Sequence, residues 1–343
     1  MDEFVIGATA HPPLDYTLIK EAGIQWLRHG FPVPFEDKIG GRLSERYLKA
    51  KQRAQERAGM GFRLMGRTPQ PGSGTYEPDQ DGNLRLVWHR RLPEWFGEAG
   101  SDRYCRTYQE MCAWMAEDLA GLVPLWQIAN ELEVPQFAGP LNLAQACELI
   151  KAGARGLKAA DPSLTVGHNA GGSGPSYFLF GRLYQCGEEL LDYCGVDQYY
   201  GSWQRGGPRD WGPRIEEVHA ITGRPVLINE WGFASAGGVM TDEERALGAP
   251  NCQLKKWSKT WGPGHTPEGQ AEFIRTALET FAEQRDKMLG FFFFRWRDTE
   301  TCWQCGEPDC PVETAWGAVD RQGRPKPSYY ALKEGITRLA AGE

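Results

Sequence analysis

The chain of 343 residues lacks any apolar run long enough to span a membrane, because its most apolar stretch, Leu289–Phe294, has only the length of a strand. It also lacks a run of basic residues, and its net charge is −7, so nucleic acid is not expected as a partner. Its first residues, Met1-Asp2-Glu3-Phe4, contain neither the basic nor the apolar segment of a secretory signal. We therefore expect a cytoplasmic protein without a membrane partner. The sequence does not indicate an oligomeric state.

Long linkers and repeats of solenoid period are absent too. Short apolar runs alternate with amphipathic stretches instead, which predicts strand–helix units around a parallel sheet. Eight such units in a chain of this length predict one (β/α)8 TIM barrel, a single domain over residues 1–343. The predicted strands are Phe4–Ala8, Gln25–His29, Phe62–Met65, Leu125–Ala129, Thr165–Gly167, Gly195–Gln198, Val226–Asn229 and Leu289–Phe294. The predicted helices are Tyr16–Ala22, Ser44–Ala58, Asp102–Asp118, Leu143–Ala160, Ser176–Cys186, Pro213–Thr222, Pro267–Arg285 and Ser328–Leu339.

Three connections in the chain are long: Gly66 to Gly100, Phe233 to Thr266 and Arg295 to Pro327. They follow the third, seventh and eighth predicted strands, so all three belong to the C-terminal face, where barrel enzymes carry their active sites. Long loops without regular structure are uncommon and are usually functional. Three of them on one face predict a deep, walled pocket.

Two apolar runs end on a glutamate: Leu125–Glu131, with the sequence Leu-Trp-Gln-Ile-Ala-Asn-Glu, and Pro225–Gly232, which contains Ile-Asn-Glu-Trp-Gly. A carboxylate at the end of a buried strand is costly to maintain unless its surroundings use it. Two such glutamates can form the acid and nucleophile of a retaining glycosidase, which requires two carboxyls about 5–5.5 Å apart. We expect Glu131 and Glu230 to be that pair.

These motifs resemble glycoside hydrolase clan A. In that clan an Asn-Glu on strand four carries the acid/base, and a Glu on strand seven, followed by an aromatic residue and Gly, is the nucleophile. Gly195–Gly201 resembles strand six of the β-glucuronidase and β-galactosidase family, where a Tyr lies beside the nucleophile. Two features depart from the pattern: Leu132 stands where many members have Pro, and no Asn-x-Lys motif, which recognises uronates, occurs. The resemblance therefore does not predict a uronic acid substrate.

The resemblance implies a retaining β-glycosidase with Glu131 as the acid/base and Glu230 as the nucleophile. A deep pocket favours exo-acting hydrolysis of terminal β-linked sugars in a β-glycoside or oligosaccharide. An endo-acting β-glycanase of the cellulase or mannanase kind, with the same two glutamates and an open cleft, is the alternative. A carbohydrate-binding barrel without catalysis is a further alternative, but the presence of both glutamates argues against it. No cofactor is expected for catalysis.

Four further residues are expected at the site from the same resemblance. Asn130 would contact the sugar 2-hydroxyl, and Arg28, at the end of the second strand, would keep the nucleophile ionised. Tyr199 would donate its hydroxyl to the nucleophile, with Tyr200 as the alternative donor. Trp296 resembles the Trp that forms the floor of the sugar subsite, and we expect it there, with packing in the barrel as the alternative.

A cysteine cluster lies in the last long loop, where Cys302, Cys305 and Cys310 form the pattern C-x2-C-G-x3-C. The C-x2-C-G portion of this pattern resembles a zinc knuckle. Cys252, in the preceding long loop, could be the fourth ligand, and some clan A β-galactosidases carry a four-cysteine zinc site. Four thiolates would close the coordination sphere, so the zinc would be structural and could not activate water. Disulfides or free thiols are the alternatives, although an odd total of nine cysteines fits a reducing compartment better than a full disulfide framework.

Overall fold

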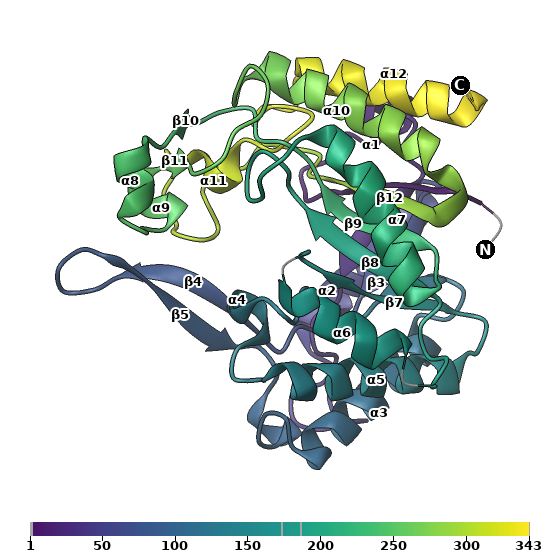
Figure 1. Ribbon diagram of the computed structural model, residues 1–343. Coiled ribbons are helices and arrows are strands. Elements are labelled where there is room, and N and C mark those ends of the chain that lie inside the picture. The colour runs from purple at the N-terminus through teal and green to yellow at the C-terminus, as the bar shows by residue number, and fades with distance from the viewer. Residues whose placement is uncertain (1–2, 173, 186, 343) are drawn as a thin grey trace.

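The computed structural model describes residues 3–172, 174–185 and 187–342, and its centre is a closed barrel of parallel strands (Figure 1). Around the barrel the strands follow the order β1-β12-β9-β8-β7-β6-β3-β2, so each strand neighbours the next barrel strand along the chain. They are β1 (Val5–Thr9), β2 (Trp26–Gly30), β3 (Arg63–Arg67), β6 (Leu125–Gln127), β7 (Thr165–Ala170), β8 (Tyr193–Gln198), β9 (Val226–Trp231) and β12 (Met288–Phe294). The predicted TIM barrel and its eight strands are confirmed.

Helices cover the outside of the barrel (Figure 1). They are α1 (Tyr16–Glu21), α2 (Glu45–Gly59), α3 (Asp102–Asp118), α5 (Leu143–Ala160), α6 (Gly174–Tyr184), α7 (Trp211–Thr222), α10 (Pro267–Glu283) and α12 (Pro327–Ala341). Ser44 caps α2, since its hydroxyl accepts the N–H of Tyr47 at 3.2 Å. The helix predicted to end at Cys186 ends at Tyr184, and Cys186 lies outside the described residues. Within the described ranges, every helix is too short or too polar to traverse a bilayer.

The long connection from Gly66 to Gly100 is not the irregular loop that its composition suggested. It contains an antiparallel hairpin of β4 (Gly72–Pro78) and β5 (Leu84–Arg90), followed by a short 3-10 helix, η1 (Glu94–Phe96). The Asp79 carboxylate closes the hairpin turn by accepting the N–H groups of Asp81 at 3.0 Å and Asn83 at 2.9 Å. The hairpin projects away from the barrel (Figure 1).

The other two long connections also contain short regular elements. These are β10 (Gly238–Val239), α8 (Asp242–Ala246), α9 (Asn251–Leu254), β11 (Lys256–Trp257) and α11 (Pro311–Thr314). They gather on the side of the molecule from which the hairpin projects (Figure 1). The N–H of Tyr76 in β4 donates to the carbonyl of Gln304 at 2.6 Å, so the first and third long loops are joined. The remaining short elements are α4 (Pro135–Ala138), η2 (Pro208–Asp210) and η3 (Arg285–Lys287).

The barrel interior has an apolar layer nearer the N-terminal ends of the strands. Large side chains fill it because two strands carry glycine there: a Cβ at Gly167 would lie 2.4 Å from the ring of Tyr193, and one at Gly7 would lie 2.3 Å from that of Phe292. The layer consists of Val5, Trp26, Met65, Leu125, Tyr193, Leu227, Leu289 and Phe292. Above it, toward the C-terminal ends of the strands, the buried side chains are polar, and these build the candidate site.

Candidate active site

Gln127, the last residue of β6, is the centre of the polar layer and is fully buried. Its Oε1 accepts from Arg28 Nε and from Asn229 Nδ2, both at 2.9 Å. Its Nε2 donates to the Asn169 Oδ1 at 2.7 Å and to the Ala129 carbonyl at 2.6 Å. The Gln127 amide thus joins side chains of β2, β7 and β9. These four hydrogen bonds can all form only if each of the joined side chains keeps one orientation.

Arg28 connects this layer to both glutamate motifs. Its guanidinium forms an ion pair with Glu230 and donates to the Asn130 Oδ1 at 2.6 Å. The Arg28 and Glu230 side chains are only 5% and 12% exposed, so solvent screens the pair little. Arg28 therefore lies beside Glu230, and its role in keeping a nucleophile ionised stays a prediction.

Glu230, near the end of β9, has surroundings that favour its ionised form. Burial alone would raise the pKa of its carboxyl, but the charge of Arg28 and hydrogen bonds from Tyr199 and Arg28 outweigh burial and hold that pKa below its usual value. The Tyr199 hydroxyl donates to one carboxylate oxygen and Arg28 to the other. The Tyr200 hydroxyl instead donates to Gln198 at 2.7 Å, so the alternative donor does not contact Glu230.

Glu131 follows β6 and has surroundings of the opposite kind. Burial, followed by the charges of Asp197 and Glu230, raises the pKa of its carboxyl well above the usual value. Its backbone has φ of +44° and that of Ala129 has φ of +50°, a left-handed conformation that residues other than glycine rarely adopt. Two such residues on either side of Asn130 mark a strained turn, which is typical of functional sites.

Asn130 is fixed by its side-chain oxygen. That Oδ1 accepts from Arg28 at 2.6 Å and from Asn169 Nδ2 at 3.0 Å, while its backbone carbonyl accepts from Gln70 Nε2 at 2.9 Å. Within the described ranges no partner is found for its Nδ2, which remains able to donate to a ligand. The residue is 5% exposed, so that donor is presented from a nearly buried position.

Trp296 was expected to contact a sugar, but its side chain is buried in the hydrophobic core. It is 1% exposed, belongs to the main hydrophobic core, and its ring packs edge-on against Tyr329 of α12 with centroids 5.9 Å apart. The alternative of barrel packing fits this position. Phe294, two residues earlier, is half-buried, and its ring lies 5.6 Å from that of Tyr199, so the aromatic residue of β12 beside the carboxyl pair is Phe294.

Two residues of the site had no role in the sequence interpretation beyond their place in a motif or strand: Gln127 and Asp197. Asp197 is 1% exposed and accepts a hydrogen bond from the Asn169 Nδ2. A signal for it was present, because Asp197 stands near the end of a predicted strand, and the ends of the barrel strands gather at the active-site face. A polar residue at such a position is a candidate for the same site.

The four predicted cysteine ligands come together. The Sγ atoms of Cys252, Cys302, Cys305 and Cys310 all lie within 4.8 Å of one another, and those of Cys252 and Cys302 are 3.9 Å apart. That separation is far longer than the S–S bond of a disulfide, about 2.05 Å, and these four thiols are free. Hydrogen bonds from Cys252 and Cys302 lower the pKa of Cys310 to about 5, whereas the pKa values of the other three thiols are raised, so a thiolate is favoured at Cys310.

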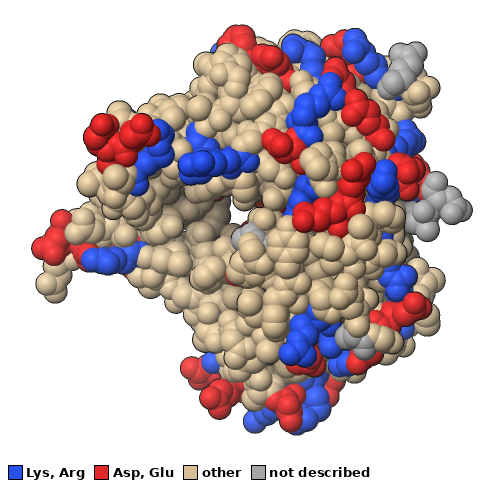
Figure 2. Space-filling view, in the orientation of Figure 1, with Lys and Arg blue, Asp and Glu red and all other residues tan. Residues whose placement is uncertain are grey.

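The cysteine cluster is connected to the site through aromatic rings. Cys252, Cys302 and Cys310 pack in one hydrophobic cluster with Trp316 and Tyr199, and the rings of Trp316 and Tyr199 lie 4.8 Å apart. Figure 2 shows a hollow between the β4–β5 hairpin and the segments that carry α8, α9 and α11. The cysteine cluster therefore supports one wall of the region above the strand ends.

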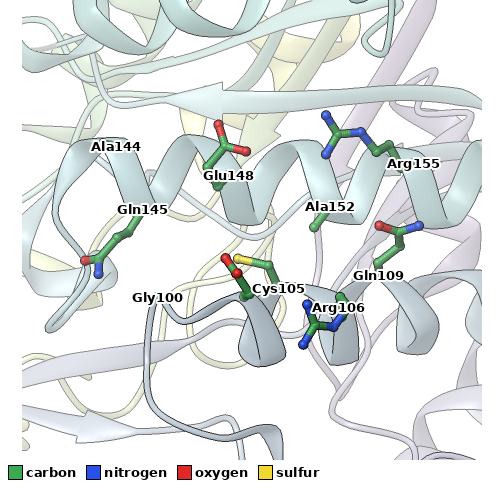
Figure 3. Close-up of a pocket in the computed structure, with 10 residues that line it drawn as sticks. Gly100, Cys105, Arg106, Gln109, Ala144, Gln145, Glu148, Ala152 and Arg155 are labelled. Atoms are coloured by element: carbon green, nitrogen blue, oxygen red, sulfur yellow. The ribbon is translucent and has the colours of Figure 1, made fainter.

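A different hollow lies on the outside of the barrel, between α3 and α5 (Figure 3). Arg106 and Gln109 of α3 and Glu148 and Arg155 of α5 line it together with Cys105. Burial raises the pKa of Cys105, so its thiol is not activated as a nucleophile. None of these lining residues belongs to the polar layer, and this hollow is not part of the candidate active site.

No family model and no curated relative matches this chain. Its fold is similar to solved structures at 15–16% identity. A β-D-glucuronidase of Dictyoglomus thermophilum aligns over 98% of this chain and 50% of its own length, with a TM-score of 0.62. A family 39 glycoside hydrolase of Bacteroides cellulosilyticus WH2 aligns over 97% and 63%, with a TM-score of 0.63. The GH53 catalytic domain of Ignisphaera aggregans aligns over 98% and 91%, with a TM-score of 0.62.

The chain thus spans half the length of the first of these proteins and 63% of the second. At this level of identity the likeness is one of fold, and it agrees with the resemblance that the two glutamate motifs indicated. The chain has the barrel fold that glycoside hydrolases of several families share.

Proposed function

We propose that this chain is a retaining, exo-acting β-glycosidase that hydrolyses terminal β-linked sugars by double displacement. The observation that carries the proposal is the opposite electrostatic environment of two glutamates on one barrel face. The pKa of Glu230 is held below its usual value despite burial, because Arg28 and Tyr199 stabilise the carboxylate. The pKa of Glu131 is raised well above its usual value by burial and by neighbouring carboxylates. Such a pair supplies a nucleophile and an acid at the same pH.

In the first step the Glu230 carboxylate attacks the anomeric carbon while Glu131 protonates the departing glycosidic oxygen. The ester formed at Glu230 removes the charge that kept the proton on Glu131. Glu131 can then act as a base, take a proton from water, and direct the hydroxyl to the anomeric carbon. Glu230 leaves as a carboxylate, and Arg28 and Tyr199 again stabilise its charge.

Two further side chains have positions suited to a bound sugar. Asn130 precedes Glu131 in the chain, and its Oδ1 accepts from Arg28, the ion-pair partner of Glu230. Its Nδ2 can donate to a sugar hydroxyl such as the 2-hydroxyl. Phe294 presents a half-buried ring beside Tyr199, and an aromatic face can pack on the C–H face of a sugar. Phe294 takes the role first expected of Trp296.

The exo mode is supported by the walls around the strand ends. The β4–β5 hairpin is joined to the last long loop by the Tyr76–Gln304 hydrogen bond, and the N–H of Leu84 donates to the Gln253 Oε1 at 2.7 Å. A pocket that loops enclose on several sides can accept the end of a sugar chain. The alternative is an endo-acting β-glycanase of the cellulase or mannanase kind, which needs a cleft open at both ends.

The test uses a panel of nitrophenyl β-glycosides, followed by product analysis on oligosaccharides. Single sugars released from one end support the exo mode, whereas internal fragments support the alternative. Glu230→Gly should lose hydrolysis and regain turnover with azide, giving the α-glycosyl azide, and Glu131→Ala should give the β-azide. Exchanged anomers would reverse the two roles, and an absence of turnover on every glycoside by the unmodified chain would refute the proposal.

We also propose that Cys252, Cys302, Cys305 and Cys310 hold one structural zinc ion. Four sulfurs around zinc at about 2.3 Å lie about 3.8 Å apart, close to the 3.9 Å between the Sγ atoms of Cys252 and Cys302. Gly306, with φ of +80°, lets the chain turn so that its N–H reaches the Cys302 carbonyl at 2.7 Å. Zinc bound there would fix the loop that packs on Trp316, and catalysis itself needs no cofactor.

A further inference from the structure

Asp197 lies directly beside the proposed nucleophile. Along the β8–β9 pair, Val196 is opposite Ile228 and Asp197 is opposite Glu230, so the register slips by one residue at this point. The slip places two carboxyls next to each other on adjacent strands. Asp197 is 1% exposed, so its carboxyl is removed from bulk water.

The Asp197 carboxyl has only part of its hydrogen-bonding capacity filled. Asn169 Nδ2 donates to its Oδ2, whereas its Oδ1 is buried and has no hydrogen-bond partner in the part of the chain that the structure describes. Asn169 also accepts the N–H of Glu131 on its Oδ1 at 3.3 Å. Asn169 therefore holds the Asp197 carboxyl and the backbone of Glu131 together.

Several titratable or charged groups surround the Asp197 and Glu131 carboxyls. They come from β2, β3, β8, β9 and the turn after β6, and they are Arg28, Arg67, Glu133, Tyr193, Tyr199 and Glu230. Arg28 contacts Glu230, and no ion pair of Arg67 is found within the described residues. Three carboxyls, those of Glu131, Asp197 and Glu230, thus share one directly paired cation.

Glu131 and Asp197 cannot both be ionised at low cost while Glu230 is charged and paired with Arg28, since neither of them has a cation of its own. Burial, followed by the charge of Glu230, raises the pKa of Asp197 well above its usual value, although the charge of Arg28 and the hydrogen bond from Asn169 oppose that rise. Burial and then the charge of Asp197 raise the pKa of Glu131. The unpartnered Oδ1 of Asp197 can carry a proton, and Asn169 joins the Asp197 carboxyl to the backbone of Glu131. This arrangement and the burial of both groups favour one proton between the two carboxyls.

We propose that Asp197 is a positioning residue that shares one proton with Glu131 and keeps the acid/base carboxyl in its acid form at neutral pH. The catalytic part of this inference rests on the proposed glycosidase function. During glycosylation the proton of Glu131 passes to the departing oxygen and Glu230 becomes an ester. The three carboxyls carry two negative charges before this step, on Asp197 and Glu230, and two after it, on Asp197 and Glu131. Their total charge does not change, so the buried site never has to hold a third negative charge.

The first test compares pH–rate profiles of the unmodified chain and of Asp197→Asn, which keeps the shape of the side chain and removes its charge. The basic limb of kcat/KM should move to lower pH by about one unit or more, since Glu131 loses its proton more easily without a neighbouring carboxylate. Asp118→Asn, which removes a carboxylate on the outer helix α3, should leave the limb in place. A limb that stays within about 0.3 units in Asp197→Asn would overturn the proposal.

The second test needs neither turnover nor a variant of Asp197. In protein labelled with carbon-13 at the carboxyls, the Glu131 and Asp197 resonances should titrate together over one pH interval above the usual range of carboxyls. The Glu131 signal is assigned by its loss in Glu131→Gln. Independent titration of the two signals, each near its usual pKa, would overturn the shared proton. Coupled titration in a chain that hydrolyses no glycoside would support the pair and refute the glycosidase function, so the two failures are distinguishable.

Discussion

Arg28 and Glu230 form an ion pair across the interior of the barrel, from β2 to β9, with both side chains almost completely buried. The pair is held from both ends, because Gln127 and Asn130 accept from the rest of the guanidinium and Tyr199 donates to the free carboxylate oxygen. A buried pair with all its hydrogen bonds satisfied maintains an ionised carboxylate where burial alone would neutralise it. The proposed chemistry depends on this relationship.

Arg28→Met should therefore remove activity and stability together. Loss of one partner leaves an uncompensated buried charge, which costs about 3–5 kcal/mol in the free energy of unfolding. The pKa of Glu230 should rise, and kcat/KM at neutral pH should fall by about 100-fold or more. Denaturant unfolding and steady-state kinetics measure both effects. Lys49→Ala, which breaks the exposed pair with Glu45, serves as the control and should cost at most about 0.5 kcal/mol.

Tyr199→Phe should move the acid limb of the pH–rate profile to higher pH. The hydroxyl stabilises the ionised form of Glu230, so its removal raises the pKa of that carboxyl, and activity that needs the carboxylate is lost at a higher pH as the solution is acidified. We expect kcat to fall by about 10- to 100-fold. Tyr200→Phe is the matched control, because its hydroxyl contacts Gln198 instead. Equal profiles for the two variants would contradict the assignment of Tyr199.

Gly171→Ala should impair catalysis through Glu131. An added Cβ would lie 3.2 Å from the Glu131 Oε1 and 3.3 Å from the Val134 Cγ2, so the carboxyl must shift. We expect kcat to fall by about 10-fold, since small displacements of catalytic groups are costly. Gly174→Ala, three residues later, meets no atom within 4 Å and should leave kcat unchanged. Equal kcat values for Gly171→Ala and the unmodified chain would show that Glu131 tolerates the crowding.

Phe294→Ala should raise KM by about 10-fold for a β-glycoside, because a ring beside the carboxyl pair is removed. Trp296→Phe should leave KM unchanged and lower the free energy of unfolding by about 1–3 kcal/mol, since this ring is part of the core. The two variants are compared by initial rates and by denaturant unfolding. A rise in KM confined to Trp296→Phe would restore the role first expected of Trp296.

Protein purified without chelator should contain one zinc ion per chain, and Cys252→Ser should reduce that content. Removal of the metal should weaken substrate binding more than it unfolds the barrel, because the cysteine cluster packs on Trp316 and, through it, on Tyr199. Metal analysis, KM and thermal melting measure the three quantities. Zinc well below one equivalent, or a disulfide between Cys302 and Cys310, would contradict the proposal.

The barrel and the places of Glu131 and Glu230 near strand ends could be predicted from the sequence because both depend on strands. Glu131 and Glu230 each follow an apolar run, and the topology of a (β/α)8 barrel brings all such strand ends to one face. Trp296 was misplaced because the alternation of faces stops where β12 ends at Phe294, and the chain after it follows tertiary contacts instead. The hairpin of β4 and β5 was missed because β4 contains Gly and Pro and β5, which is nowhere fully buried, lacks a clear alternation of apolar and polar residues.

The left-handed turn at Ala129 and Glu131 limits how this protein can be engineered. Selection for heat resistance alone would favour glycine at both positions, because glycine adopts a positive φ without penalty. At Glu131 that choice would delete the proposed acid together with the strain. An engineer seeking a hardier variant should leave this turn as it is and modify the outer helices, where better capping and surface charge can raise stability without disturbing the strand ends.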